Sequence, residues 1–207
     1  TAAFALPILN QISKKDGKVK AIILCPTREL CLQISEDIKK FIKFSKDISV
    51  TPVYGGERID IQIRSLKKGP DIVVGTPGRV NDLIRRKILK LGNIEWLVLD
   101  EADEMLDMGF KEELDSIMEV TSESKQTLLF SATISKTIQS MAKKYMKEVE
   151  EIDGGGKSLG ADKVNHEYYV VNTNNRFEAL QRILDFLPDI YGIIFCRTKQ
   201  ETQYICD

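Results

Sequence analysis

The chain has 207 residues, of which 43% are hydrophobic and 29% charged, and its formal net charge is −1 at pH 7. This composition suits a globular protein with a core, and the small net charge provides no general attraction to nucleic acid or membranes. No apolar run approaches the roughly 20 residues of a membrane span, and the first residues lack the pattern of a signal peptide. We therefore expect a cytoplasmic protein with no membrane partner, in which any nucleic-acid binding depends on local motifs.

The first 150 or so residues alternate between apolar strand patterns and amphipathic helical patterns. The expected strands cover 20–25, 48–54, 71–75, 95–100 and 127–132. The expected helices cover 2–12, 29–44, 59–68, 79–87, 111–120 and 136–146. Near-continuous apolar strands that alternate with helices predict an α/β fold, with a mostly parallel sheet covered by helices on both faces.

The composition changes after residue 152. Residues 153–163 are rich in glycine and polar side chains, which predicts a linker, and we interpret the GGGKS stretch at 154–158 as part of it. A second unit is expected at 164–207. Its expected elements are strands at 164–171 and 192–198 and helices at 176–187 and 199–207. Two strands and two helices cannot cover both faces of a sheet, so we expect this unit to be incomplete and to expose apolar side chains.

The cysteines and the single histidine predict neither a metal site nor a histidine-based catalytic triad. Cys25, Cys31, Cys196 and Cys206 form no C-x-x-C pair, and we expect them to be buried, reduced thiols. His166 lies in the alternating run VNHEYYVV and is expected to be a strand residue.

A polar or glycine-containing stretch follows each of the five expected strands of the first unit. These stretches are PTREL (26–30), YGG (54–56), GTPGR (75–79), DEAD (100–103) and SAT (131–133). The carboxyl ends of parallel strands lie at one edge of a sheet, where open α/β sheets bind their ligands. Turn chemistry explains any one of these stretches, but all five in order predict a binding site at that edge.

The acidic pair Asp100 and Glu101 follows the buried run WLVL directly. Asp100 can hold Mg²⁺ through water beside bound phosphates, and Glu101 can orient or deprotonate a water that attacks the γ-phosphate. An acidic first turn that complements a helix dipole explains the pair alone equally well. The whole DEAD tetrapeptide after a buried strand favours the functional interpretation. Thr1 opens a helical pattern, either as a plain N-cap or as the last residue of a phosphate loop.

The order PTREL, GG, TPGR, DEAD, SAT and IIFCRTK resembles the DEAD-box ATP-dependent RNA helicases of superfamily 2. The resemblance covers nearly the whole chain, starting at the last residue of the phosphate loop and ending early in a second RecA-like domain. It implies a RecA-like ATP-binding domain without its first strand and phosphate loop at 1–152, a linker at 153–163 and the start of the second domain at 164–207. The glutamine motif, most of the phosphate loop and the arginine-rich motif of the family are absent from these residues.

The resemblance implies ATP and Mg²⁺ as cofactors and assigns a role to each matching residue. Thr1 and Asp100 would bind Mg²⁺, Glu101 would activate water, and all three would contact the bound nucleotide. The residues implied to couple the ATP site to domain closure are Asp103, Ser131, Ala132 and Thr133. Ser131 and Thr133 are equally compatible with ordinary strand-end caps.

The resemblance also implies an RNA surface. Its residues are Pro26, Thr27, Arg28, Gly56, Thr76, Pro77, Gly78, Arg79, Gly109, Phe110, Arg197 and Thr198. Backbone N–H groups, hydroxyls and guanidinium groups bind phosphate and sugar without reading bases, and contacts to 2′-hydroxyls favour RNA over DNA. Arg28 is also compatible with a helix-start residue paired with Glu29 or another carboxylate, and Phe110 with a core residue.

The implied function is ATP-driven closure of two domains over single-stranded RNA, which locally unwinds short duplexes. One alternative is a truncated RNA-binding fragment that does not hydrolyse ATP, and a second is a related DNA helicase. Because a phosphate loop supplies most contacts to the triphosphate, we expect these 207 residues alone to be inactive as an ATPase. The sequence indicates no protein partner.

Overall fold

The structure is a computed structural model that describes residues 1–12, 16–44, 47–152 and 164–207. The chain divides into two compact units, Thr1–Glu151 and Ile152–Asp207. The predicted linker 153–163, including the GGGKS stretch, lies outside the described residues. Within the described part of the chain, no helix combines the length and the apolar character needed to cross a bilayer.

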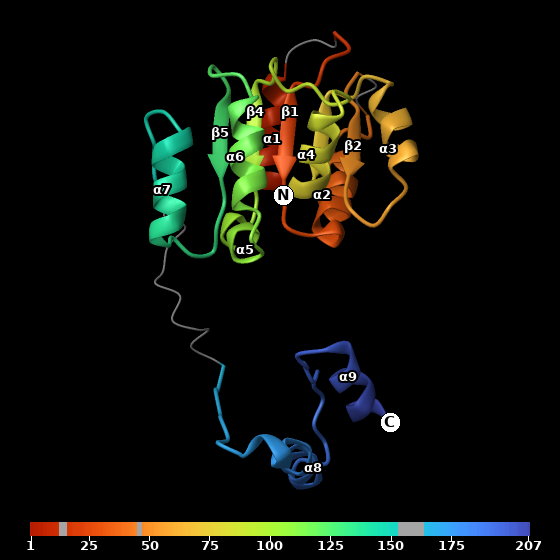
Figure 1. The fold of residues 1–207 in the computed structure, drawn as a ribbon, viewed down its shortest axis with the longest axis vertical. Coiled ribbons are helices and arrows are strands. Elements are labelled where there is room, and N and C mark those ends of the chain that lie inside the picture. Colours follow the sequence, from red (N-terminus) through yellow and green to blue (C-terminus); the bar gives the residue numbers. More distant parts are fainter. Residues whose placement is uncertain (13–15, 45–46, 153–163) are drawn as a thin grey trace. The chain divides into compact units, whose positions relative to one another are not determined.

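The first unit is built on a parallel sheet of five strands in the order β2-β3-β1-β4-β5 (Figure 1). The strands are β1 (Ala21–Leu24), β2 (Val50–Val53), β3 (Ile72–Gly75), β4 (Trp96–Leu99) and β5 (Gln126–Leu129). Every neighbouring pair is parallel, and in the central strand Ala21 lies opposite both Ile72 and Trp96. The predicted parallel α/β fold is confirmed, and each predicted strand of this unit is present.

Seven helices connect and cover these strands in the described part of the unit. They are α1 (Ala2–Gln11), α2 (Arg28–Phe41), α3 (Ile59–Leu66), α4 (Pro77–Arg85), α5 (Ala102–Asp107), α6 (Lys111–Glu119) and α7 (Lys136–Tyr145). Local chemistry sets their first turns. The Thr27 hydroxyl accepts a hydrogen bond from the Leu30 amide at 3.2 Å, and Pro77 fills the first turn of α4, where no N–H is needed.

Helices cover both faces of the sheet because successive strand residues point to opposite sides. In β1, Ala21 and Ile23 pack into one apolar cluster with α1 and α2, whereas Ile22 and Leu24 pack into another with the buried side chains of α3 to α7. All four side chains are at most 1% exposed, which explains why this strand reads as a continuous apolar run.

The second unit contains a 3₁₀ turn (Thr173–Asn175), α8 (Arg176–Phe186) and α9 (Lys199–Cys206). The rings of Phe177 and Tyr204 pack against each other with centroids 5.1 Å apart and so join the two helices. Both predicted helices are therefore confirmed.

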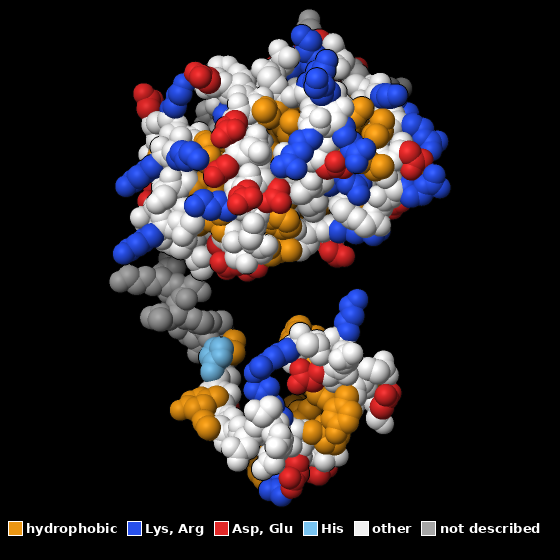
Figure 2. Space-filling view, in the orientation of Figure 1, with side chains coloured by type: hydrophobic (Ala, Val, Ile, Leu, Met, Phe, Trp, Pro, Cys, Tyr) orange, Lys and Arg blue, Asp and Glu red, His pale blue; other side chains and the backbone are white. Residues whose placement is uncertain are grey.

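The two strands predicted for the second unit are wrong, because residues 164–171 and 192–198 form no strand. A strand needs a hydrogen-bonded neighbour, and the described residues of this unit provide none. The apolar side chains of both stretches are largely exposed, as predicted: Val170 is 91% exposed and Phe195 90%. Hydrophobic side chains are visible on the surface of this unit in Figure 2.

The loss of these strands also corrects the predictions for three side chains. His166 is not a strand residue but lies in an exposed, irregular segment. Cys25 and Cys31 are buried as predicted, whereas Cys196 is only half-buried and Cys206 is exposed. The last two thiols lie in the unit that does not form a covered sheet, which explains the difference.

Close packing at the end of β3 requires a glycine. A Cβ atom added to Gly75 would lie 2.7 Å from Val53 Cγ2 and 3.1 Å from the Val53 carbonyl oxygen, and it would also collide with the Val80 side chain. The backbone atoms of β2 and the first turn of α4 can therefore approach β3 closely only because this position has no side chain.

Gly75→Ala is expected to lower the free energy of unfolding of the first unit by about 1–3 kcal/mol, because the added methyl group overpacks the site. Trp96 is the only tryptophan of the chain and lies in β4, so its fluorescence during urea denaturation reports on this unit. The control is Gly92→Ala, whose added methyl group meets no atom within 4 Å. Equal stability of the two variants would contradict the packing argument.

Candidate functional site

The five polar stretches lie together at the carboxyl edge of the sheet because all five strands run in the same direction. Backbone hydrogen bonds join the first residues beyond the strands. The Asp100 amide donates to the Leu24 carbonyl at 2.9 Å, and the Thr76 amide donates to the Val53 carbonyl at 3.1 Å. The chain leaves β1 toward one face of the sheet and leaves its neighbours β3 and β4 toward the other. Such a switch point is where open α/β sheets bind ligands.

Asp100 and Thr1 lie close together at this edge. The Asp100 carboxyl group is half-buried, and burial raises its pKa, while the hydrogen bond from the Glu101 amide offsets part of this effect. Thr1 occupies the N-cap position of α1, but its hydroxyl makes no capping hydrogen bond. The Thr1 hydroxyl is therefore not used in the plain N-cap role.

Glu101 has a strained backbone, with φ 52° and ψ 54° in the left-handed region. This conformation costs a glutamate roughly 1–2 kcal/mol. Hydrogen bonds on both sides hold it: the Ala102 amide donates to the Phe130 carbonyl at 3.0 Å, and the Met105 amide donates to the Glu101 carbonyl at 3.1 Å. Desolvation and then the charges of nearby acids, Asp100 first, raise the pKa of Glu101. A raised pKa makes a carboxylate a better proton acceptor.

Asp103 joins the DEAD stretch to the SAT stretch. Its Oδ2 atom accepts hydrogen bonds from both the amide and the hydroxyl of Thr133, each at 2.9 Å, while its buried Oδ1 atom has no hydrogen-bond partner. Burial acts to raise the pKa of Asp103, but the hydrogen bonds from Thr133 outweigh it and the pKa is lowered. The Ser131 hydroxyl donates to the Thr133 carbonyl at 2.7 Å, and Ala132 between them is exposed.

The predicted RNA residues from three stretches lie around the loop that contains Gly56. Arg79 donates from both terminal nitrogens to the Glu57 carbonyl, at 3.2 and 3.1 Å. The Arg28 guanidinium lies over the Tyr54 ring, 4.9 Å from its centroid, and pairs with Glu57 rather than with Glu29. Gly56 itself has φ 77°, which favours glycine. Lys and Arg side chains also gather on the side of this unit that carries α3 (Figure 2).

The remaining predicted RNA residues differ in accessibility. Pro26, Thr76 and Pro77 are buried, Thr27 is half-buried, and Gly78 is exposed. Buried positions of this kind can present backbone groups, but they offer little side-chain surface.

Gly109 and Phe110 lie between α5 and α6. Gly109 is exposed with φ 84°, whereas the half-buried Phe110 packs against the apolar cluster beneath α4 to α7. In the second unit, the Arg197 amide donates to Glu201 and the Thr198 hydroxyl accepts from the Glu201 amide at 3.1 Å, capping α9. Phe110 therefore packs as the alternative prediction of a core residue described, and the Thr198 side chain caps a helix.

Two residues that organise the site were missed in the sequence. The Glu57 backbone carbonyl accepts the hydrogen bonds of Arg79. The Gln62 side chain accepts from the Tyr54 amide at 3.2 Å and donates to the Tyr54 carbonyl at 3.0 Å. Gln62 is 4% exposed. A glutamine on the apolar face of a predicted helix was a usable signal for it, because buried amides need partners; Glu57 carried no such signal.

Within the described ranges, His, Cys, Asp and Glu side chains nowhere gather in a group of three that could hold a metal ion. Asp100 and Thr1 lie near each other at the carboxyl edge, and their roles as magnesium ligands stay predictions.

Asp100→Asn is expected to raise the free energy of unfolding of the first unit at pH 7, because the folded state holds a carboxylate that burial destabilises. A carboxyl group whose pKa rises on folding favours the folded state below its unfolded pKa, and this contribution is lost as pH rises through the folded pKa. The gain of the variant should therefore disappear at about pH 3, where aspartate is protonated in both states. Urea denaturation followed by Trp96 fluorescence measures it.

Asp103→Asn provides the matched comparison, since its pKa is lowered on folding. Such a group stabilises the protein above its unfolded pKa, and the stabilisation is lost as pH falls through the folded pKa. We expect this variant to be less stable at pH 7 by about 1 kcal/mol. If both variants changed stability in the same direction, the electrostatic description of this edge would be wrong.

Comparison with known proteins identifies relatives along the whole chain. A family model described as DEAD/DEAH box helicase matches residues 1–141. The chain is 44% identical over 200 residues to the ATP-dependent RNA helicase CshA of Listeria monocytogenes, covering 97% of this chain and 38% of that protein. It is 42% identical over 207 residues to the DEAD-box ATP-dependent RNA helicase CshA of Bacillus cereus, covering 100% of this chain and 39% of that protein.

A solved structure is similar as well. The crystal structure of a DEAD box protein from the hyperthermophile Methanococcus jannaschii matches with a TM-score of 0.71 and 40% identity, covering 99% of this chain and 54% of that chain. The predicted RecA-like fold class and the resemblance are confirmed. The chain spans only 38% to 39% of the length of the curated relatives it matches. It belongs to the DEAD/DEAH box helicase family.

Proposed function

We propose that this chain is part of an ATP-dependent RNA helicase that couples ATP binding and hydrolysis to local remodelling of RNA duplexes. The observation that carries the proposal is the gathering of the DEAD, SAT, PTREL, GG and TPGR stretches at one sheet edge, linked by hydrogen bonds between their loops. The names of the curated relatives support the same activity. We also propose a cytoplasmic location and no membrane partner.

In this proposal Thr1 and Asp100 hold Mg²⁺ and, with Glu101, form the nucleotide site. Proteins commonly hold Mg²⁺ through one or two carboxylates together with substrate phosphates and waters. A half-buried carboxylate near an unused hydroxyl fits that ligand set. The ion supplies neutralisation of the charge that develops on the transferred phosphoryl group. Asp100 would be the carboxylate ligand of the ion, and Glu101 would accept a proton from water.

RNA binding is proposed for the twelve residues named for it in the sequence, through backbone contacts without base specificity. Support is strongest at the loop formed by Tyr54 to Glu57, where Arg28 and Arg79 converge from two other stretches. Support is weakest for Phe110 and Thr198, because packing and capping already account for their side chains.

We further propose that Asp103, Ser131, Ala132 and Thr133 carry the state of the nucleotide site to the rest of the helicase. The Asp103–Thr133 hydrogen bonds support this role, because they tie the DEAD stretch to the loop that leaves β5. Residues 1–152 would be the ATP-binding domain, 153–163 the linker and 164–207 the start of the second RecA-like domain. The two compact units divide between residues 151 and 152, in keeping with that proposal.

The test is the ATPase activity of the full-length gene product with and without single-stranded RNA. We expect RNA to stimulate hydrolysis, and Glu101→Gln to lower kcat by at least about 100-fold, because general-base catalysis contributes about 10²–10⁴-fold. Glu119→Gln, which removes an equal charge at the last residue of α6, is the control. ATPase activity that survives in Glu101→Gln would contradict the assignment.

Single-stranded DNA of the same length and at the same salt concentration separates the remaining alternatives. Stimulation by RNA alone supports the RNA helicase, whereas preferential stimulation by DNA would establish the DNA helicase. RNA binding without any ATPase activity of the full-length gene product would leave only the RNA-binding alternative.

A further inference from the structure

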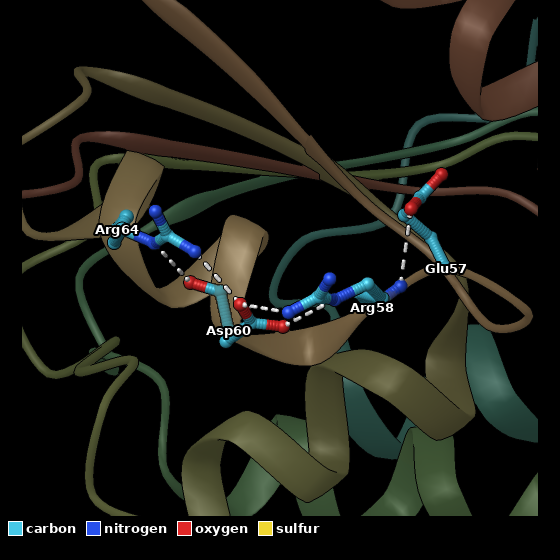
Figure 3. A network of polar contacts seen from close by, with 4 residues as sticks. All are labelled: Glu57, Arg58, Asp60 and Arg64. Carbon is cyan, nitrogen blue, oxygen red and sulfur yellow. Dashed lines mark hydrogen bonds and ion pairs between the residues drawn. The ribbon is translucent and has the colours of Figure 1, made fainter.

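Glu57 occupies the centre of the loop at which three of the polar stretches meet. Its backbone carbonyl accepts both hydrogen bonds of Arg79. Its side chain does two other things: Oε1 accepts from the Arg58 amide at 3.1 Å (Figure 3), and Oε2 lies 4.0 Å from the Arg28 Nη2 atom. The backbone and the side chain of Glu57 therefore have separate partners.

The Arg28 guanidinium also lies over an aromatic ring and beside Gly56. The Tyr54 ring lies beneath it, 4.9 Å from the guanidinium carbon, and a Cβ added to Gly56 would come within 3.8 Å of its Nη1 atom. The Arg28 side chain is nevertheless 45% exposed and that of Glu57 33% exposed, so solvent reaches the ion pair. A guanidinium that lies over an aromatic ring and is partly exposed to solvent is ready to bind an anion.

We propose that the Glu57 carboxylate competes with an RNA phosphate for Arg28 and thereby weakens the RNA affinity of this surface. The inference rests on the proposed RNA-binding function and names a residue that tunes it. A carboxylate and a phosphate oxygen are similar ligands for a guanidinium group. When RNA binds, a phosphate takes the place of Glu57 Oε2 at Arg28, and the carboxylate keeps its hydrogen bond to the Arg58 amide.

Of the two neighbouring acids, Glu57 and Asp60, only Glu57 pairs with an arginine of the predicted RNA surface in the described residues. Arg58 and Arg64 share the carboxylate of Asp60, with the Arg64 Nη2–Asp60 Oδ2 contact at 2.7 Å (Figure 3). The two guanidinium groups of that network outnumber their single carboxylate. Among the ion pairs of the described residues, Glu57 alone sets one negative charge against one arginine of the predicted RNA surface, at a distance where exchange with solvent or ligand costs little.

Glu57→Gln tests the carboxylate without disturbing the loop. The amide oxygen of glutamine can still accept from the Arg58 amide, and the backbone carbonyl that holds Arg79 is unchanged. Only the charge opposite Arg28 is removed. Equal thermal melting temperatures of the variant and the wild type would confirm that the loop is intact.

The experiment measures the affinity of the full-length gene product for a fluorescein-labelled oligouridine by anisotropy, at salt concentrations from about 50 to 200 mM. We expect Glu57→Gln to bind about two- to fivefold more tightly at the lowest salt, the range set by exposed ion pairs. Its slope of log affinity against log salt should be steeper by up to about one unit, because in the wild type the displaced Glu57 carboxylate takes up a cation and so offsets part of the counterion release at the phosphate. Glu119→Gln should match the wild type.

The Arg28→Gln background separates competition at Arg28 from a general effect of charge. We expect Arg28→Gln to weaken binding and to eliminate the gain from Glu57→Gln. An equal gain in both backgrounds would overturn the inference, because the effect would then not pass through Arg28. If Arg28→Gln weakens binding and Glu57→Gln does not strengthen it, the inference alone is wrong. If Arg28→Gln has no effect, the proposed RNA surface fails at this position and the inference fails with it.

Discussion

The parallel pairing of β1 to β5 is the constraint on which the rest of this structure depends. Because every strand ends at the same edge, residues more than 100 positions apart in the chain, such as Pro26 and Ser131, lie in loops along one line. The strand interiors are sealed by apolar clusters on both faces, so only the residues just past each strand can meet a ligand. The register of β1 against β3 and β4 therefore also sets the positions of the candidate site residues that follow these strands.

This edge carries several features that oppose folding. Asp100 is a partly buried acid, Glu101 has a left-handed backbone, and Asp103 leaves one buried oxygen without a partner. Strain and buried charge concentrate at functional sites, where the surrounding structure must compensate for them. Here the compensation comes from the hydrogen bonds of the neighbouring loops and from the two apolar clusters below.

Sequence patterns predicted the elements whose residues show a local apolar period, and they missed the features that depend on contacts between distant parts of the chain. The apolar runs predicted all five strands of the first unit, because β1, β3 and most of β4 are buried on both faces, while the edge strands β2 and β5 are partly buried. The six-residue α5 was missed, since it is short and its acids were explained as site residues. Residues 164–171 have a good strand pattern but no neighbouring strand among the described residues. Glu57 was missed because its contacts come from Arg28 and Arg79, which only the folded sheet brings together.

We propose above all that Asp103 and Thr133 link the proposed nucleotide site energetically to the proposed RNA surface of this edge. The most direct measurement is the affinity of the full-length gene product for oligouridine with and without a non-hydrolysable ATP analogue and Mg²⁺. We expect tighter RNA binding with the nucleotide and, by linkage, tighter nucleotide binding with RNA, and both effects should be smaller in Thr133→Val. RNA affinity that does not change with nucleotide in the wild type would contradict it.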